Sequence, residues 1–136
     1  MFTIDHLGIA VKSLAAAKKF YEDLGMAVMP EETVESEKVR LAMVPVGESR
    51  IELLEPTSDE SAIAKFLSKR GEGLHHVALH VENLVATVER MKAAGTRFIS
   101  DEIKTGAGGH SYIFVHPSSA GGVLLELCQD QPVGVS

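Results

Sequence analysis

The chain has 136 residues, of which 45% are hydrophobic and 24% charged, and its mean hydropathy of +0.09 is that of an ordinary globular protein. This length predicts a single domain, residues 1–136, that folds without a disulfide or a structural metal. The net charge of −6 argues against nucleic acid as a partner, and no apolar stretch approaches the roughly 20 residues that span a bilayer. With membrane and nucleic acid set aside, the expected partner is a small molecule. A single cysteine and an N-terminus without a basic, apolar leader predict a cytoplasmic protein.

The first module, about residues 1–56, is predicted to have the order βαβββ. A strand of alternating character over residues 2–11 is followed by helical spacing, with Ser13 as the N-cap and Gly25 as the stop. Three further strands are expected at residues 26–32, 38–46 and 49–55. Residues 57–73 form a linker with its own short helix over residues 61–70.

The second module, about residues 74–129, is predicted to copy the first. Its strand covers residues 74–81, and its helix begins after Asn83 and ends at Gly95. Three more strands are expected at residues 97–100, 111–116 and 122–128, and residues 130–136 are expected to form a frayed tail.

The two modules carry the same residue types at matched positions. Residues 74–81 repeat residues 4–11 and pair His76 with His6 at an offset of 70 (76 − 6), and the module ends pair Glu126 with Glu52 at an offset of 74 (126 − 52). Self-similarity at a fixed period is the mark of a repeated structural unit. The sequence therefore predicts an α+β fold of two tandem βαβββ modules, which form a curled, half-barrel mixed β-sheet with helices on its outer face.

Strand parity predicts which side chains share a face, because successive side chains point to opposite sides of a sheet. His6, Gly8 and Ala10 share the face away from the helices, and His76 with Ala78 repeats the arrangement. Small residues beside a histidine leave room for a ligand. A sheet that curls would bring both ends of each module together, so that two imidazoles and two carboxylates meet.

Such a ligand set suits a divalent ion: Zn²⁺, Co²⁺, Mn²⁺ or Ni²⁺. One histidine on a strand is more often a hydrogen-bonded core residue, and a carboxylate flanked by apolar residues is common on edge strands. Four ligand-type residues at equivalent places in two repeats favour the metal site: His6, Glu52, His76 and Glu126.

Other conspicuous residues are given structural roles. His75 faces away from His76, and His80, about 13 Å further along at ~3.3 Å per residue, cannot join the same metal. The glycine-rich residues 106–109 predict a mobile hairpin that closes over a ligand, because the features of a phosphate loop are missing. Cys128 is expected to be a buried thiol. A solvated basic patch is expected on the linker helix: Lys65, Lys69 and Arg70.

The order His, Glu, His, Glu on paired βαβββ modules resembles the vicinal-oxygen-chelate superfamily. Within it, the chain is most similar to the methylmalonyl-CoA epimerase family, over residues 3–129. The similar segments are residues 4–11, 50–58, 63–67, 71–76, 106–109, 116–117 and 121–127. The last three segments and the linker helix are more specific than the His-Glu pattern, which the whole superfamily shares.

The resemblance implies a metal-dependent enzyme that interconverts the 2R and 2S forms of methylmalonyl-CoA. It makes His6, His76 and Glu126 metal ligands, and Glu52 the fourth ligand, where some epimerases have Gln. Glu126 and Glu52 are the candidates for moving the proton at the α-carbon. The expected partners are an acyl-CoA substrate and, because half-barrels leave strand edges exposed, a second copy of the chain in a homodimer.

Two departures accompany the resemblance. Some epimerases place a second acid-base Glu on the third strand, where this chain has Arg40, so that the second base is expected to be a residue or water near Arg40 unless Glu52 serves. His110 stands where relatives often carry a basic residue such as Lys.

Three alternatives share the scaffold. A lactoylglutathione lyase of the glyoxalase I type has the same ligand types, but its Asp-Pro-Asp-Gly turn is replaced here by residues 116–122. A non-catalytic resistance module usually lacks the full ligand set. An extradiol dioxygenase needs two histidines and one carboxylate around iron and is normally built from more modules.

Overall fold

The computed structural model describes residues 2–130 and has an α+β architecture, which confirms the predicted fold class. Two compact units share these residues. We call residues 6–75 the N-terminal unit, and residues 2–5 together with 76–130 the C-terminal unit. The predicted tail beyond Asp130 lies outside the described residues. Each unit contains the repeated set of elements that the sequence predicts.

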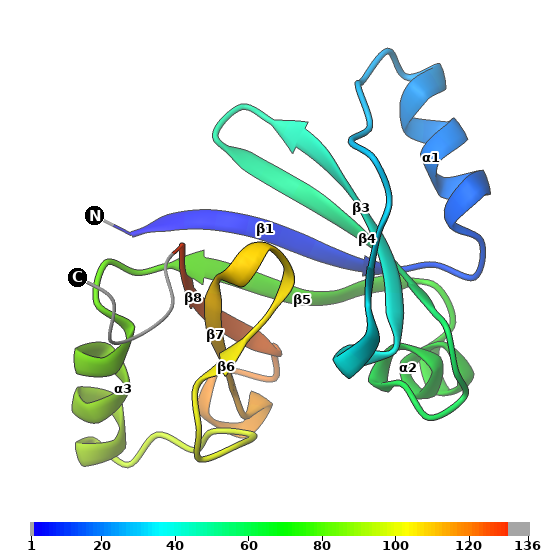
Figure 1. Cartoon of the computed structure of the whole chain (residues 1–136). Helices are drawn as coiled ribbons and strands as arrows, with labels where there is room; N and C mark the ends of the chain where they lie inside the picture. Colours follow the sequence, from blue (N-terminus) through cyan, green and yellow to red (C-terminus); the bar gives the residue numbers. More distant parts are fainter. Residues whose placement is uncertain (1, 131–136) are drawn as a thin grey trace. The chain divides into compact units, whose positions relative to one another are not determined.

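The N-terminal unit carries the first module and the linker helix (Figure 1). Its strands hydrogen-bond in the order β2-β3-β4-β1, with β1 parallel to β4 and the other pairs antiparallel. As predicted, the Ser13 hydroxyl accepts the Ala16 N–H at 3.1 Å, and Gly25 follows the helix with a left-handed φ of 101°. The elements are β1 (Thr3–Ala10), α1 (Leu14–Asp23), β2 (Glu32–Val34), a 3-10 turn (Glu35–Glu37), β3 (Val39–Val46), β4 (Ser49–Pro56) and α2 (Ala62–Arg70).

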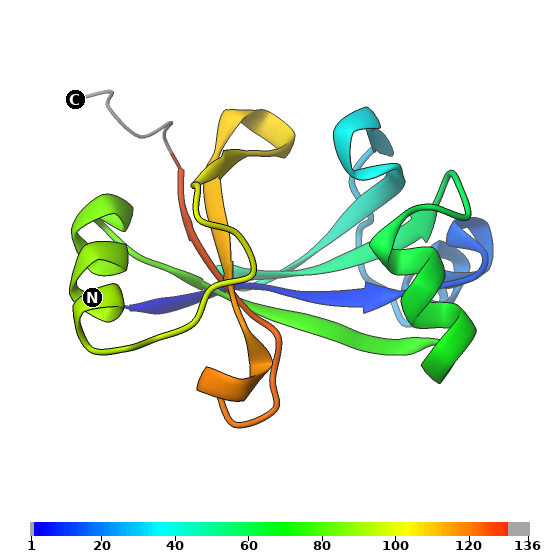
Figure 2. The ribbon, with the colours of Figure 1, turned by 90° about the horizontal axis from the view of Figure 1, so that it is seen from below.

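The C-terminal unit repeats this arrangement with strands in the order β5-β8-β7-β6. Strand β5 is parallel to β8, and β7 is antiparallel to both of its neighbours. Two 3-10 turns, Ala107–Gly109 and Pro117–Ser119, stand at opposite ends of β7 (Figure 2). The other elements are β5 (Gly73–His80), α3 (Leu84–Ala93), β6 (Lys104–Thr105), β7 (Ser111–Val115) and β8 (Leu125–Gln129).

The hydrophobic cores of the two units are built at matching positions. The core of the N-terminal unit consists of Val11, Leu14, Ala42, Val44 and Leu53. In the C-terminal unit their repeat partners are Val81, Leu84, Ile113, Val115 and Leu127. Burying one such aliphatic side chain contributes about 1.5–3 kcal/mol, so each unit has its own stabilising core between helix and sheet.

The predicted positions of two strands, the second strand of each module, are wrong. Within residues 26–32, only Glu32 belongs to a strand, and residues 97–100 hold one isolated bridge, from Phe98 to Val115, in place of a ladder. Val28 and Phe98 pack against the cores of their units, so the apolar spacing at both places reflects packing of an extended segment. The missing strand of the second module is β6, which begins at Lys104.

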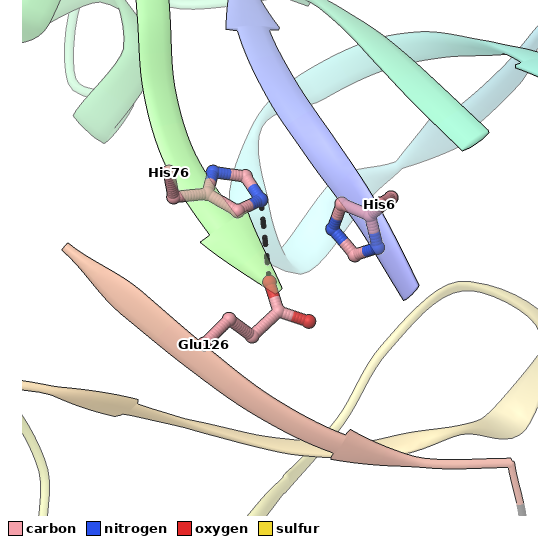
Figure 3. A group of neighbouring side chains, drawn as sticks. All are labelled: His6, His76 and Glu126. Carbon is pink, nitrogen blue, oxygen red and sulfur yellow. Dashed lines mark ion pairs between the residues drawn. The ribbon is translucent and has the colours of Figure 1, made fainter. Parts of the chain in front are cut away.

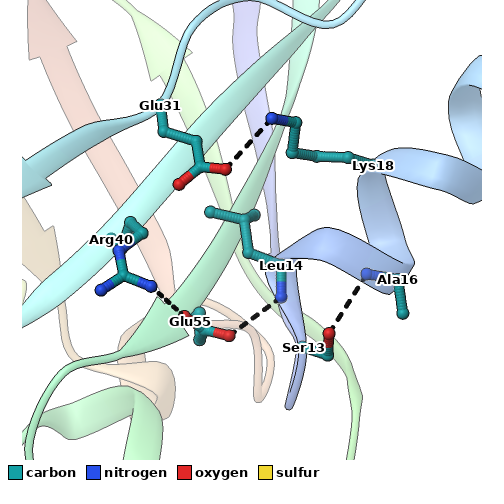
Figure 4. Close-up of polar contacts among 7 residues, drawn as sticks. All are labelled: Ser13, Leu14, Ala16, Lys18, Glu31, Arg40 and Glu55. Carbon is teal, nitrogen blue, oxygen red and sulfur yellow. Dashed lines mark hydrogen bonds and ion pairs between the residues drawn. The ribbon is translucent and has the colours of Figure 1, made fainter.

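The first N–H group of each main helix is bonded by a side chain of the module's last strand. The Leu14 N–H donates to Glu55 Oε1 at 3.0 Å, and the Leu84 N–H donates to Gln129 Oε1 at 2.9 Å. Such N–H groups have no acceptor within the helix. Glu55 also pairs through its other oxygen with Arg40 at 2.9 Å (Figure 4).

We expect Glu55→Ala to lower the free energy of unfolding by about 1–2 kcal/mol, because the partly buried Leu14 N–H loses its acceptor. Glu55→Gln should cost about 0–1 kcal/mol, because its amide oxygen can still accept, as Gln129 does, and only the half-exposed pair with Arg40 is lost. Urea unfolding of both variants measures this. Equal losses would show that the ion pair carries the effect.

Candidate metal and acid-base site

In the N-terminal unit, a buried imidazole faces a buried carboxylate. His6 on β1 is 3% exposed and Glu52 on β4 is 8% exposed, and His6 Nε2 lies 3.4 Å from Glu52 Oε1. The parallel register puts Gly8 beside Glu52, and β3 puts Met43 on its other side. Because glycine has no side chain, none projects from Gly8 beside the carboxylate.

The C-terminal unit contains the same pair at the matching places. His76 on β5 and Glu126 on β8 are both 5% exposed, with His76 Nε2 at 3.3 Å from Glu126 Oε1 (Figure 3). Ala78 stands beside Glu126 in the parallel register, and Phe114 stands on its other side. The Phe114 ring meets the imidazole of His76 edge to face at 5.4 Å, which fixes the plane of that imidazole.

Burial makes these pairs chemically significant. Removing a carboxylate from water costs several kcal/mol unless a partner offsets it, and structures rarely bury such groups without a function. Each unit supplies one imidazole and one carboxylate, which are ligand types that Zn²⁺ and related divalent ions accept. His6, His76 and Glu126 each offer one ligand atom, and Figure 3 shows the strands that carry them. The donor chemistry therefore fits a divalent ion.

A further imidazole borders Glu126 and was not predicted as a site residue. His110 Nε2 lies 3.9 Å from Glu126 Oε2, and the side chain of His110 is 27% exposed. Strand parity indicates its face, because residues 110, 112 and 114 lie on the same side of the strand. The register then sets Phe114 directly opposite Glu126.

Arg40 does not lie beside Glu52. The antiparallel register sets Met43 opposite Glu52 and sets Arg40 opposite Glu55. Figure 4 shows the ion pair between Arg40 and Glu55. Since Glu55 bonds the start of α1, Arg40 shares the helix side of the sheet. Arg40 therefore does not share the face of the sheet that carries Glu52, and a second base near Arg40 stays a prediction.

The remaining sequence candidates occupy structural positions. The ring of His75 meets Phe66 edge to face at 5.0 Å, and His80 lies 3.5 Å from Asp130 near the end of β5. Cys128 is 2% exposed and its thiol donates to the Leu79 carbonyl at 3.6 Å, so the predicted buried thiol is confirmed. The glycine-rich turn joins β6 to β7, as the predicted hairpin requires. Exposed positions on α2 carry the basic side chains of Lys65, Lys69 and Arg70.

Comparison with known proteins identifies the family. The model of the glyoxalase/bleomycin resistance protein/dioxygenase superfamily matches residues 5–114. The chain belongs to this superfamily. The described residues contain no helix that is long and apolar enough to cross a membrane.

Similar proteins also confirm the resemblance to methylmalonyl-CoA epimerases. A mitochondrial methylmalonyl-CoA epimerase from Mus musculus is 40% identical over 93% of this chain and 72% of its own length. An ethylmalonyl-CoA/methylmalonyl-CoA epimerase from Cereibacter sphaeroides is 37% identical, over 93% of this chain and 96% of its own. A solved structure of a Streptomyces coelicolor methylmalonyl-CoA epimerase variant with 2-nitronate-propionyl-CoA has a TM-score of 0.89 at 37% identity, covering 98% of this chain and 96% of that one.

Proposed function

We propose that this protein is a metal-dependent epimerase that interconverts (2R)- and (2S)-methylmalonyl-CoA. The observation that carries the proposal is the pair of buried imidazole-carboxylate contacts at matched register, one in each unit. Relatives that cover nearly the whole chain are named for this activity and support the same substrate class. A glyoxalase I reaction on a glutathione hemithioacetal is the alternative to be assayed beside it.

The proposed metal ligands are His6, Glu52, His76 and Glu126, with Co²⁺, Zn²⁺, Mn²⁺ or Ni²⁺ as the ion. Neutral imidazoles and carboxylates that are held by strands, and not by loops, give a rigid ligand set. A bound divalent ion supplies positive charge that offsets, by several kcal/mol, the negative charge developing on the thioester oxygen when the α-proton leaves.

The two carboxylates have the chemistry that inversion requires. One group must remove the proton from the α-carbon, and a second must return a proton to the opposite face. Glu126 is the proposed first base, and Glu52 is the proposed second group. Both are buried, so water competes poorly for the reacting carbon.

If the ligand assignment is right, His6→Ala or His76→Ala will remove the metal while the fold survives, because each unit has its own hydrophobic core. Elemental analysis of dialysed protein measures the metal, and urea unfolding of metal-free samples measures the fold. The matched control is His75→Ala, next to His76 but packed on Phe66, which should keep the metal. Stoichiometric metal in either active-site variant would refute the assignment.

The roles of the carboxylates can be separated by solvent-deuterium uptake into each methylmalonyl-CoA epimer at matched metal content. Glu126→Gln should slow uptake by about 10²–10⁴-fold, because an amide cannot accept the proton. Glu52→Gln should be milder, with Glu55→Gln on the outer face of the same strand as the control. Wild-type rates in Glu126→Gln would reject it as a base, and total loss in Glu52→Gln with metal retained would give Glu52 the larger role.

We also propose a homodimer in the cytoplasm. Strands β1 and β5 begin with large apolar side chains that are exposed in one chain, Ile4 at 47% and Leu74 at 55%, and a second copy is proposed to cover them. The expected mass in solution at micromolar concentration is about 29 kDa, twice the 14.6 kDa of one chain. Light scattering that returns the mass of one chain would contradict the dimer.

A further inference from the structure

The two oxygens of the Glu126 carboxylate face two different imidazoles. Oε1 lies 3.3 Å from His76 Nε2, and Oε2 lies 3.9 Å from His110 Nε2. The carboxylate is almost completely buried, with 6% of its side chain exposed, whereas 27% of the His110 side chain is exposed. His110 therefore stands between a buried carboxylate and the surface.

This second contact constrains a torsion that is otherwise loose. The last torsion of a Glu side chain is broad, so one partner on one oxygen leaves the plane of the carboxylate poorly defined. A polar group near each oxygen favours one orientation of the plane, as neighbouring groups do for metal ligands in many sites, although 3.9 Å is longer than a hydrogen bond. If Oε1 and His76 bind an ion, His110 lies next to the other carboxylate oxygen, Oε2.

The glycine-rich turn is shaped around the imidazole of His110. The Gly106 N–H donates to the His110 carbonyl at 2.9 Å, and the imidazole lies 5.6 Å from the ring of Tyr112 at a tilt of 35°. A Cβ atom on Gly106 would come within 2.9 Å of both His110 Cε1 and Tyr112 Cε1.

Gly106 is needed for space and not for its backbone conformation. Its φ of −116° and ψ of −157° are open to any residue. The imidazole of His110 therefore lies between Gly106 and Tyr112, in space that a Cβ atom at position 106 would occupy.

We propose that His110 is a positioning residue that fixes the orientation of the Glu126 carboxylate and, with it, the affinity of the site for a divalent ion. The inference rests on the proposed function in so far as Glu126 is a metal ligand and base. It assigns to the glycine-rich turn the role of holding this imidazole against Glu126.

The test compares His110→Leu, which removes the nitrogen, with His110→Gln, whose amide nitrogen can reach a similar position. Zn²⁺ and Co²⁺ affinities are measured by calorimetry, and the visible spectrum of bound Co²⁺ reports the ligand geometry. His110→Leu should weaken binding about 10–100-fold and change the spectrum, and His110→Gln should restore most of both. The matched control, His80→Leu, removes an imidazole of the same unit and should leave both unchanged.

Gly106→Ala displaces the imidazole without removing it. This variant should lower Co²⁺ affinity in the same direction as His110→Leu, and the double variant should show no further loss, because both changes act on one contact. Fully additive effects would mean that Gly106 acts through another group. If His110→Leu folds poorly, Gly106→Ala still tests the contact between His110 and Glu126.

Unchanged Zn²⁺ and Co²⁺ affinity and an unchanged Co²⁺ spectrum in folded His110→Leu would overturn the inference. Turnover of methylmalonyl-CoA is measured on the same samples at saturating metal, where a fall in kcat with KM unchanged is expected. If the wild-type protein binds metal but leaves methylmalonyl-CoA unchanged, the proposed function fails while the affinities still decide the role of His110. A wild-type protein that binds neither ion overturns the metal site and this inference together.

Discussion

A carboxylate that is buried beside an imidazole is the interaction on which the rest of this molecule depends, and it occurs once in each unit. Neither Glu52 nor Glu126 could be buried alone, since an isolated carboxylate in a protein interior costs several kcal/mol. The hydrophobic cores on the helix side of each sheet supply the stability that offsets this cost. The candidate site and the hydrophobic core therefore occupy opposite faces of the same strands.

The parallel pairing of the first and last strands of each module brings imidazole and carboxylate together. It sets Gly8 beside Glu52 and Ala78 beside Glu126, two residues after the histidine in each case. A large side chain at either position would fill the space next to the carboxylate. The small residues are thus as much a part of the candidate site as the ligand-type residues.

Much of this arrangement can be predicted from the sequence, because the repeat fixes equivalent positions and strand parity fixes faces. The helix caps Ser13 and Asn83 and the buried histidines follow from local patterns. The second strand of each module does not, because apolar residues such as Val28 and Phe98 give the same spacing when they pack on a core without a ladder. Parity places His110 on the same face as Phe114, but the position of that face opposite Glu126, like the position of Arg40, depends on the register between strands.

The last strand of each module carries two matched positions that differ in which residue types they accept. Glu55 and Gln129 stand three residues after Glu52 and Glu126 and bond the first N–H of α1 and α3, although one is a carboxylate and the other an amide. A helix N-terminus needs only an acceptor, so the outer position tolerates either group. The inner position has a carboxylate in both modules, and at Glu126 the proposed proton transfer requires one, because an amide cannot accept the proton. Three residues along one strand therefore separate an acceptor that bonds a helix end from a carboxylate that is proposed to move a proton.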